Sequence, residues 1–331
     1  MSEHSKKAER IRQALGGEAV DQRPFSFWTH LPGIDLDPVR LAEETNAFFR
    51  EYDVDFVKTM PNGMYAIEDF GCEIDYSDIP KGGVARIVST PVNEPADWDR
   101  IAAPAPDAGA LGRELDSLHR LLGLINGDAP AVFTVFSPLT VAHKLSGNRC
   151  LGWIREGRET ERLHRALATI ADALAVYFAR AVDMGAAGVF FATQTAGQDE
   201  LTPEQYAEFG AAYDLRALEG AKDGWFNILH LHGDGVRFHE VIDYPVQALN
   251  WHVWETAPTM AEARAATGKC LVGGIDRRLI TAADRTAVAR QIDAAWEQSQ
   301  GKGHIVTPGC TIRYPLDRET LSFIRTYVHE G

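Results

Sequence analysis

The sequence predicts an α/β fold in which eight parallel strands close into a (β/α)8 barrel, also called a TIM barrel. Two observations predict this fold. Short apolar segments rich in β-branched and aromatic residues recur along the chain, and segments with helical periodicity separate most of them. The 331 residues also suffice for a barrel of about 250 residues with extensions. An open doubly wound sheet is the alternative, but no Gly-rich phosphate-binding fingerprint follows any predicted strand.

The first elements show one complete strand-and-helix unit. A short amphipathic helix is expected at residues 5–15, and Gly16 and Gly17 end it. Residues 24–30 form an aromatic predicted strand, and residues 38–52 have the spacing of a helix. The pattern of this unit then repeats. The other seven predicted strands are residues 53–60, 131–137, 187–193, 226–232, 247–253, 269–273 and 304–308.

Helical segments supply the crossovers that parallel strands require. Between residues 71 and 106 the pattern changes, because the apolar residues 85–88 are flanked by Gly and Pro, and we expect a β excursion within an early barrel loop. No low-complexity linker divides the chain, so residues 1–331 are expected to form a single barrel domain. The helices predicted most clearly are residues 159–184, 203–223, 260–267 and 282–300.

Composition excludes several classes of partner. The formal net charge of −14 argues against a nucleic acid partner, because binding begins with cationic neutralisation of phosphates. Residues 1–7 are polar and lack the apolar core of a signal peptide, and the chain has no uninterrupted apolar run of about 18 residues. Four scattered cysteines are too few for a disulfide framework. We therefore expect a soluble, cytoplasmic protein with no membrane partner.

Polar side chains gather where the predicted strands end. In a (β/α)8 barrel the carboxyl ends of the strands carry the chemistry, so these residues are the candidates for a functional site. His30, Asn62 and Gln194 are candidates for contacts with a substrate. The full set at or just past strand ends is His30, Asn62, Ser137, Thr193, Gln194, His230, His232, His252, Asp276 and Cys310.

His230 and His232 form the most specific pair in this set. Alternate residues of a strand point to the same face, so both imidazoles can converge on one metal ion. Cys310 ends the last predicted strand, and barrel closure would bring it to the same rim. Three such ligands leave a fourth position open, as a catalytic zinc site requires. The alternative is a pair of hydrogen-bonded histidines in the barrel mouth and a small buried thiol.

Two further polar residues are candidates for catalysis. His252 lies at the end of the sixth predicted strand and Asp276 just past the seventh, and each is suited to acid/base work or to orienting a metal ligand. Structural hydrogen bonding explains either residue equally well.

Several sequence blocks resemble the uroporphyrinogen decarboxylase superfamily, and the similarity runs over nearly the whole chain. The fold of that family is a (β/α)8 barrel, which agrees with the strand count. Individually the blocks are loose patterns, but their order and spacing are specific. They are residues 9–11 with 14–16 and 21–24 (the entry helix and first strand), 137–142 (P-x-T-x-A), 185–190 (G-A-x-G-x-x), 201–206, 273–276 and 307–310.

One departure separates the branches of this superfamily. True decarboxylases carry an arginine-rich motif after the first strand that holds the carboxylates of a porphyrinogen, and residues 27–35 contain no arginine. The methyltransferase branch uses zinc bound by a His-x-Cys pair on the fifth strand and a distant cysteine on the last. Here His230, His232 and Cys310 occupy those places, and His232 stands where the family has cysteine.

The resemblance implies a zinc-dependent methyltransferase. In that branch the metal binds an acceptor thiol and lowers its pKa, so that the thiolate attacks a methyl group. The expected partners are a small-molecule methyl donor or acceptor and a corrinoid, which is a substrate or is carried on a partner protein, and barrel helices would provide a homodimer contact. A metal-assisted hydrolase, lyase or decarboxylase on the same barrel is the second hypothesis, and a non-catalytic protein that senses a small ligand is the third.

Overall fold

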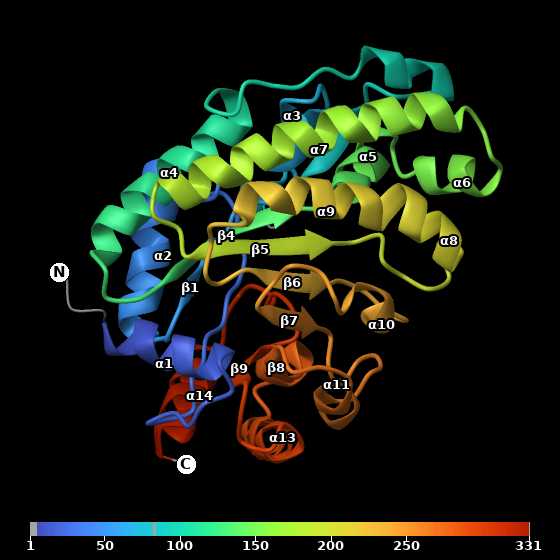
Figure 1. The fold of residues 1–331 in the computed structure, drawn as a ribbon. Helices are drawn as coiled ribbons and strands as arrows, with labels where there is room; N and C mark the ends of the chain where they lie inside the picture. The colour runs from blue at the N-terminus through green and yellow to red at the C-terminus, as the bar shows by residue number, and fades with distance from the viewer. Residues whose placement is uncertain (1–4, 82–83, 331) are drawn as a thin grey trace.

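A computed structural model describes residues 5–81 and 84–330, and its fold is α/β, as predicted. Within the described residues, seven parallel strands form one curled sheet in the order β1-β4-β5-β6-β7-β8-β9 (Figure 1). The strands of this sheet lie in the order of the chain, and a separate antiparallel pair of strands falls in the connection between β1 and β4. The strands are β1 (Val57–Lys58), β4 (Ala131–Phe136), β5 (Gly188–Thr193), β6 (Ile228–Leu231), β7 (Ala248–Trp251), β8 (Cys270–Ile275) and β9 (His304–Pro308).

The first predicted strand differs from the expectation of eight regular strands. Residues 24–30 make only isolated parallel bridges, which pair Phe25 with Val306 and Thr29 with Ile312. On the side facing β1, one backbone hydrogen bond is found among the described residues. The Asp55 N–H donates to the Phe25 carbonyl (2.9 Å). Side chains provide the other links, since the Phe25 N–H donates to the Asp55 carboxylate (2.8 Å) and the Ser26 hydroxyl donates to the Phe56 carbonyl (2.7 Å). Side-chain partners therefore replace the regular ladder on that side.

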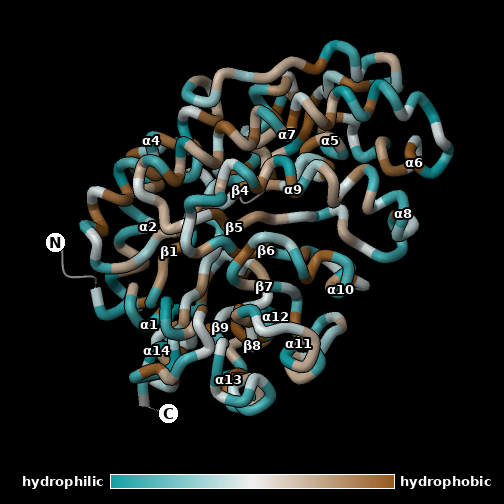
Figure 2. Tube along the Cα trace, in the orientation of Figure 1, coloured by the Kyte–Doolittle hydropathy of each residue, from teal (hydrophilic) through white to brown (hydrophobic). Residues whose placement is uncertain are grey.

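Helices pack around the outside of the curled sheet. In Figure 1, α4, α7 and α9 lie above the strands, while α1, α13 and α14 lie below them. Hydrophilic and hydrophobic residues alternate along these outer helices, as one apolar stripe facing the core requires (Figure 2). The longer helices are α1 (Lys6–Leu15), α2 (Pro38–Tyr52), α4 (Gly109–Ile125), α5 (Pro138–Leu145), α7 (Thr160–Asp183), α9 (Ala212–Leu218), α11 (Met260–Ala266), α13 (Arg285–Gln298) and α14 (Arg318–Glu330).

The remaining predicted elements occur in the structure, with three refinements. Of the second predicted strand, residues 53–60, only Val57–Lys58 form a regular strand. The early excursion is an antiparallel pair, β2 (Glu73–Asp75) and β3 (Arg86–Ser89). The helix predicted at residues 203–223 is divided into α8 (Pro203–Tyr206), a π-helical turn at Ala207–Ala211, α9 and a short 3₁₀ turn at Glu219–Ala221. The short helices are α3 (Tyr65–Glu68), α6 (Cys150–Arg155), α10 (Phe238–Val241) and α12 (Arg277–Thr281).

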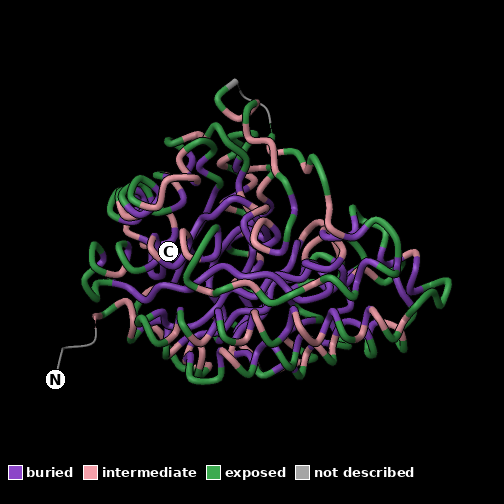
Figure 3. Tube along the Cα trace, turned by 90° about the horizontal axis from the view of Figure 1, so that it is seen from above, coloured by how far each residue is buried: buried purple, intermediate pink, exposed green. Residues whose placement is uncertain are grey.

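The strands lie in the core of the molecule. Every residue of β4 through β9 is buried, and Figure 3 shows buried residues in the middle of the molecule and exposed ones along its outline. None of the helices in the described part of the chain is long and apolar enough to cross a membrane. The polar start of the chain, residues 1–4, lies outside the described residues.

A buried carboxyl group in α9 makes stability depend on pH. Asp214 has no exposed surface, and it accepts hydrogen bonds from the hydroxyls of Tyr206 (3.2 Å) and Tyr244 (3.0 Å). Burial raises the pKa of Asp214 to about 7. The folded state therefore holds this proton more tightly than the unfolded state, and the resulting stabilisation is lost as pH rises from the unfolded pKa, near 3.8, through about 7.

We expect Asp214→Asn to remove this pH dependence, because an amide oxygen still accepts both tyrosine hydroxyls but carries no charge. The stability of the wild type relative to the variant should fall between about pH 4 and pH 7 and then level off. Urea unfolding across this range measures the difference, with the exposed Asp172→Asn as control. A constant difference between wild type and Asp214→Asn would contradict the prediction.

Candidate metal centre

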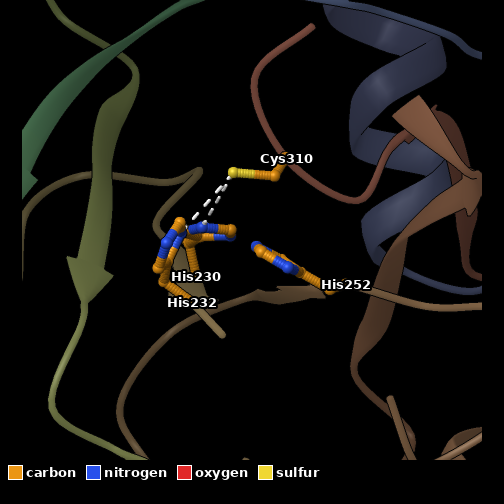
Figure 4. Close-up of side chains that lie close together, drawn as sticks. All are labelled: His230, His232, His252 and Cys310. Carbon is orange, nitrogen blue, oxygen red and sulfur yellow. Dashed lines mark hydrogen bonds between the residues drawn. The ribbon is translucent and has the colours of Figure 1, made fainter. Parts of the chain in front are cut away.

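Four potential metal ligands meet at the carboxyl edge of the sheet. They are His230, His232, His252 and Cys310, whose ligand atoms all lie within 4.8 Å of one another. The Cys310 thiol sulfur is 3.8 Å from His230 Nε2 and 3.6 Å from His232 Nδ1 (Figure 4). The sequence-predicted set of His230, His232 and Cys310 is thus brought together, and His252 joins it.

Strand geometry and one close backbone approach create this meeting. His230 lies in β6 and His232 follows its end, so the alternation of a strand turns both rings to one face. Cys310 reaches the rings because Gly309 lets its loop pack against the end of β7. A Cβ atom on Gly309 would lie 2.8 Å from the Trp251 carbonyl oxygen, closer than real Cβ contacts allow.

Asn250 of β7 sets the tautomer of His230. Its amide nitrogen donates to the carbonyls of Val272 (2.7 Å) and Pro308 (3.4 Å), so its oxygen must face His230. That oxygen lies 2.5 Å from His230 Nδ1, which therefore carries the proton and donates it. The lone pair of His230 is left on Nε2, the nitrogen that faces Cys310.

The histidine rings of the cluster are held neutral. Burial is the main cause: it lowers the pKa of His230 well below 6.5, and it lowers the pKa of His232 with help from the charge of Arg277. The pKa of His252 falls to about 3 through burial and the neighbouring His232. Neutral imidazoles offer a lone pair to a metal at neutral pH without first losing a proton. Burial also raises the pKa of the Cys310 thiol.

The cluster forms part of the wall of a large pocket. The pocket has a volume of about 950 Å³, and His230, His232 and Cys310 line it, whereas His252 does not. The walls are largely apolar and aromatic, and a few polar side chains converge on the cavity, as in most small-molecule sites. The apolar and aromatic lining includes Trp28, Met60, Met64, Phe136, Phe190 and Ile312.

The other candidate residues divide into two groups. His30, Asn62 and Gln194, the candidates for substrate contacts, all line the pocket. Asp276 does not line it: its carboxylate caps α12 through the Arg278 N–H (2.8 Å) and forms an ion pair with the Arg278 guanidinium (2.6 Å). Asp276 therefore has a structural role as a helix cap, which was one of the two interpretations of its place in the sequence.

Sequence reasoning missed the three cations that line the pocket, Lys58, Arg277 and Arg313. Lys58 lies in β1, and its side chain is charged yet only 7% exposed. A lysine near the carboxyl end of a predicted strand was the available signal, because burying an ammonium group is costly unless it has a function or a partner.

The donor set fits a zinc ion. Tetrahedral zinc with bonds of about 2.0–2.1 Å to nitrogen and about 2.3 Å to sulfur places those ligand atoms roughly 3.5 Å apart. The two nitrogen–sulfur separations, 3.8 and 3.6 Å, are close to this value. His252 Nε2 is a buried polar atom without a hydrogen-bond partner, and it belongs to the same cluster. An ion would satisfy this nitrogen.

Comparison with solved structures relates the fold to known enzymes. A methyltransferase from Methanosarcina mazei superposes with a TM-score of 0.83 at 20% sequence identity, over 99% of this chain and 99% of that one. A B12-independent methionine synthase from a Shewanella species aligns with a TM-score of 0.60 at 13% identity, over 93% and 97% of the two chains. At such identities the likeness shows the fold.

Curated relatives and a family model identify the family. A protein named uroporphyrinogen decarboxylase from Trichodesmium erythraeum is 23% identical, over 95% of this chain and 93% of its own length. Another of the same name from a Polaromonas species is 26% identical, over 73% and 70%. The family model described as uroporphyrinogen decarboxylase (URO-D) matches residues 6–331. The chain therefore belongs to the uroporphyrinogen decarboxylase family.

Proposed function

We propose that this protein is a zinc-dependent methyltransferase that moves a methyl group between a small methylated substrate or a corrinoid and a thiol or corrinoid acceptor. The observation that carries the proposal is that His230, His232 and Cys310 converge at one end of a large apolar pocket. The fold shared with a methyltransferase of Methanosarcina mazei supports it. A corrinoid carried on a separate protein is the partner proposed.

We further infer that residues 24–30 close the curled sheet into a barrel. This segment bridges to Val306 of β9 and accepts a hydrogen bond from Asp55, just before β1. It thus lies between the two edge strands of the sheet. Closure explains why Trp28 and Thr29 line the same pocket as His230, which lies in β6.

The pocket geometry supports a catalytic site over a structural one. A structural zinc site fills all four positions with protein ligands, whereas a catalytic site leaves one position for substrate or water. Three of the cluster residues line the cavity, so a small molecule in the pocket can approach an ion held there. His252 does not line the cavity, and its unpartnered Nε2 would be a fourth ligand that the substrate displaces.

Each residue of the site has a defined role in this proposal. When bound, zinc would supply Lewis acidity, which lowers the pKa of a thiol and makes the thiolate nucleophile available near neutral pH. His230 presents Nε2 because Asn250 holds its Nδ1 proton. Cys310 contributes a thiolate that offsets part of the metal charge. The apolar walls exclude water from the transferring methyl group, and Gln194 offers an amide at the pocket wall to position the substrate.

Decarboxylation of a porphyrinogen is the rival suggested by the names of the relatives, which are 23% and 26% identical. A substrate with many carboxylates needs several cations to hold it. Residues 27–35 contain no arginine, and the basic side chains lining the pocket are Lys58, Arg277 and Arg313. Arg277 is already within 3.4 Å of the Glu255 carboxylate. This supply of cations favours a substrate with few negative charges.

The first prediction concerns metal content. Purified wild-type protein should contain close to one zinc per chain, and His232→Ala and Cys310→Ala should lose it, because each removes one of three ligands facing the pocket. Cys270→Ala, which alters a buried cysteine outside the cluster, should keep it. Elemental analysis measures the metal, and methyl transfer from methylcobalamin to small thiols tests the activity. Wild-type protein that takes up no zinc would refute the site.

The second prediction concerns Asn250. Asn250→Ala should lower zinc affinity by about 10- to 100-fold, the usual effect of removing a group that orients a metal-binding histidine. Competition with a chelator measures the affinity. Circular dichroism must show a folded variant, since Asn250 also bonds Val272 and Pro308. Unchanged affinity would mean that His230 is not a ligand.

The third prediction concerns pH. The Cys310 thiol, whose pKa is raised by burial, must lose its proton to bind zinc, whereas the histidines are already neutral because burial lowers their pKa values. Zinc affinity should therefore rise about tenfold per pH unit between roughly pH 6 and pH 8. Chelator competition at several pH values gives the slope. A slope of zero would exclude Cys310 as the ligand that ionises.

A further inference from the structure

Lys58 is a buried cation in the wall of the pocket that the proposed chemistry does not use. It ends β1 and is 7% exposed, and it lines the same cavity as His230 and Cys310. Its ammonium group lies 4.7 Å from the ring centre of Phe190 and 5.6 Å from that of Trp28. These two rings replace part of the water that an exposed lysine would have around it.

The hydrogen-bonding capacity of Lys58 is largely unused. An ammonium group has three N–H donors, and the structure gives Lys58 one bond, to the Thr59 carbonyl at 3.2 Å. Among the residues that the structure describes, no carboxylate oxygen lies within the 4.0 Å limit of an ion pair with it. Burial without a carboxylate partner lowers the pKa of Lys58 to about 7. A negatively charged group in the pocket would oppose that shift and keep the amine protonated.

The charges around the pocket also favour an anion. The chain has a net charge of −14, yet the pocket is lined by three basic side chains and one carboxylate, Asp35. Glu255 lies near Arg277 (3.4 Å), and Arg313 is exposed at its place in the pocket wall. Lys58 is therefore the buried lining cation that lacks a carboxylate partner.

The Cys310 thiolate is the alternative partner for Lys58, because its negative charge would raise the pKa of the lysine. In the proposed metal centre, however, that thiolate already faces a zinc ion with two positive charges. One thiolate cannot balance both the ion and the ammonium group. Asp35 is the carboxylate that lines the pocket, and it makes no ion pair with Lys58, so an anion from outside the protein is suited to balance the excess positive charge of the loaded site.

We propose that Lys58 binds the negatively charged group of the substrate, which is a small organic carboxylate with an apolar body. The carboxylate accepts the two free N–H donors of Lys58, the apolar body lies along Trp28 and Phe190, and the reacting atom faces His230, His232 and Cys310. This inference rests on the proposed function in taking the pocket as the substrate site. The anion contact itself does not require a metal.

A matched pair of ligands tests the role of charge. Benzoate and benzamide have similar shapes, but only benzoate is charged at neutral pH, and the aromatic pocket can hold either ring. The affinity of the purified protein for each is measured by ligand-observed NMR titration. The wild type should bind benzoate about tenfold more tightly than benzamide, because hydrogen bonds to charged groups are the stronger ones.

Three variants test whether the charge of Lys58 causes the preference for benzoate. Lys58→Met keeps the length of the side chain and should bring the affinity ratio close to one, whereas Lys58→Arg should keep a preference for benzoate. Lys144→Met is the matched control, because Lys144 also lies against an aromatic ring (Phe136, 4.8 Å) and bonds one carbonyl (Gly63, 2.9 Å) but does not line the pocket. Its ratio should stay at the wild-type value.

Repeating the titrations after zinc has been removed with a chelator separates this inference from the proposed function. A preference that survives zinc removal and is lost in Lys58→Met supports the lysine contact, even if the protein binds no zinc. Equal affinities in the wild type would overturn the inference. So would a preference that persists in Lys58→Met, because the carboxylate would then bind the metal or Lys58 would serve only to balance Cys310.

Discussion

The buried amide of Asn250 is the interaction on which the carboxyl edge of the sheet depends. From β7 it bonds Val272 of β8, Pro308 of β9 and His230 of β6, so one side chain joins four neighbouring strands. A buried amide of this kind is stable only when its hydrogen bonds are made. The same side chain that links these strands thus also orients His230, whose Nε2 faces the candidate metal site. A change at Asn250 would therefore affect both the packing of the strands and the site.

The large apolar pocket gives the site its chemical character. Much of its lining is apolar and aromatic, so the few polar groups that reach the cavity are less screened than they would be in bulk water. Neutral imidazoles, a thiol and an unpaired ammonium group share this space. Burial favours the neutral form of each of these groups. The neutral form suits the histidines, which bind a metal as neutral imidazoles, whereas Cys310 must lose its proton to bind zinc and an anion in the pocket would keep Lys58 protonated.

The departures from the family pattern concern charge. A histidine at position 232 replaces a negative thiolate ligand by a neutral one, so a bound zinc ion would keep more of its positive charge. The segment at residues 27–35 lacks the arginines that the decarboxylases use, and Lys58 is the buried lining cation without a carboxylate partner. The missing arginines favour a substrate with fewer negative charges than a porphyrinogen, in line with the proposed function.

The sequence by itself determined the α/β class, the order of the strands and the set of polar residues at the strand ends, because these follow from local periodicity and from the rule that parallel strands end at one edge. It also determined that His230 and His232 share a face. Irregular pairing at residues 24–30 escaped prediction, since the side chains of Asp55 and Ser26 take part in it.

Only the tertiary structure decided which of the distant candidates meet. Cys310 is 80 residues from His230, and its approach depends on the close packing of Gly309 against β7. His252 enters the cluster while Asp276 turns to cap α12, although the two looked alike in sequence. The physical reason is that distances between strands depend on how the sheet curls and how loops pack over it, and no local pattern records either.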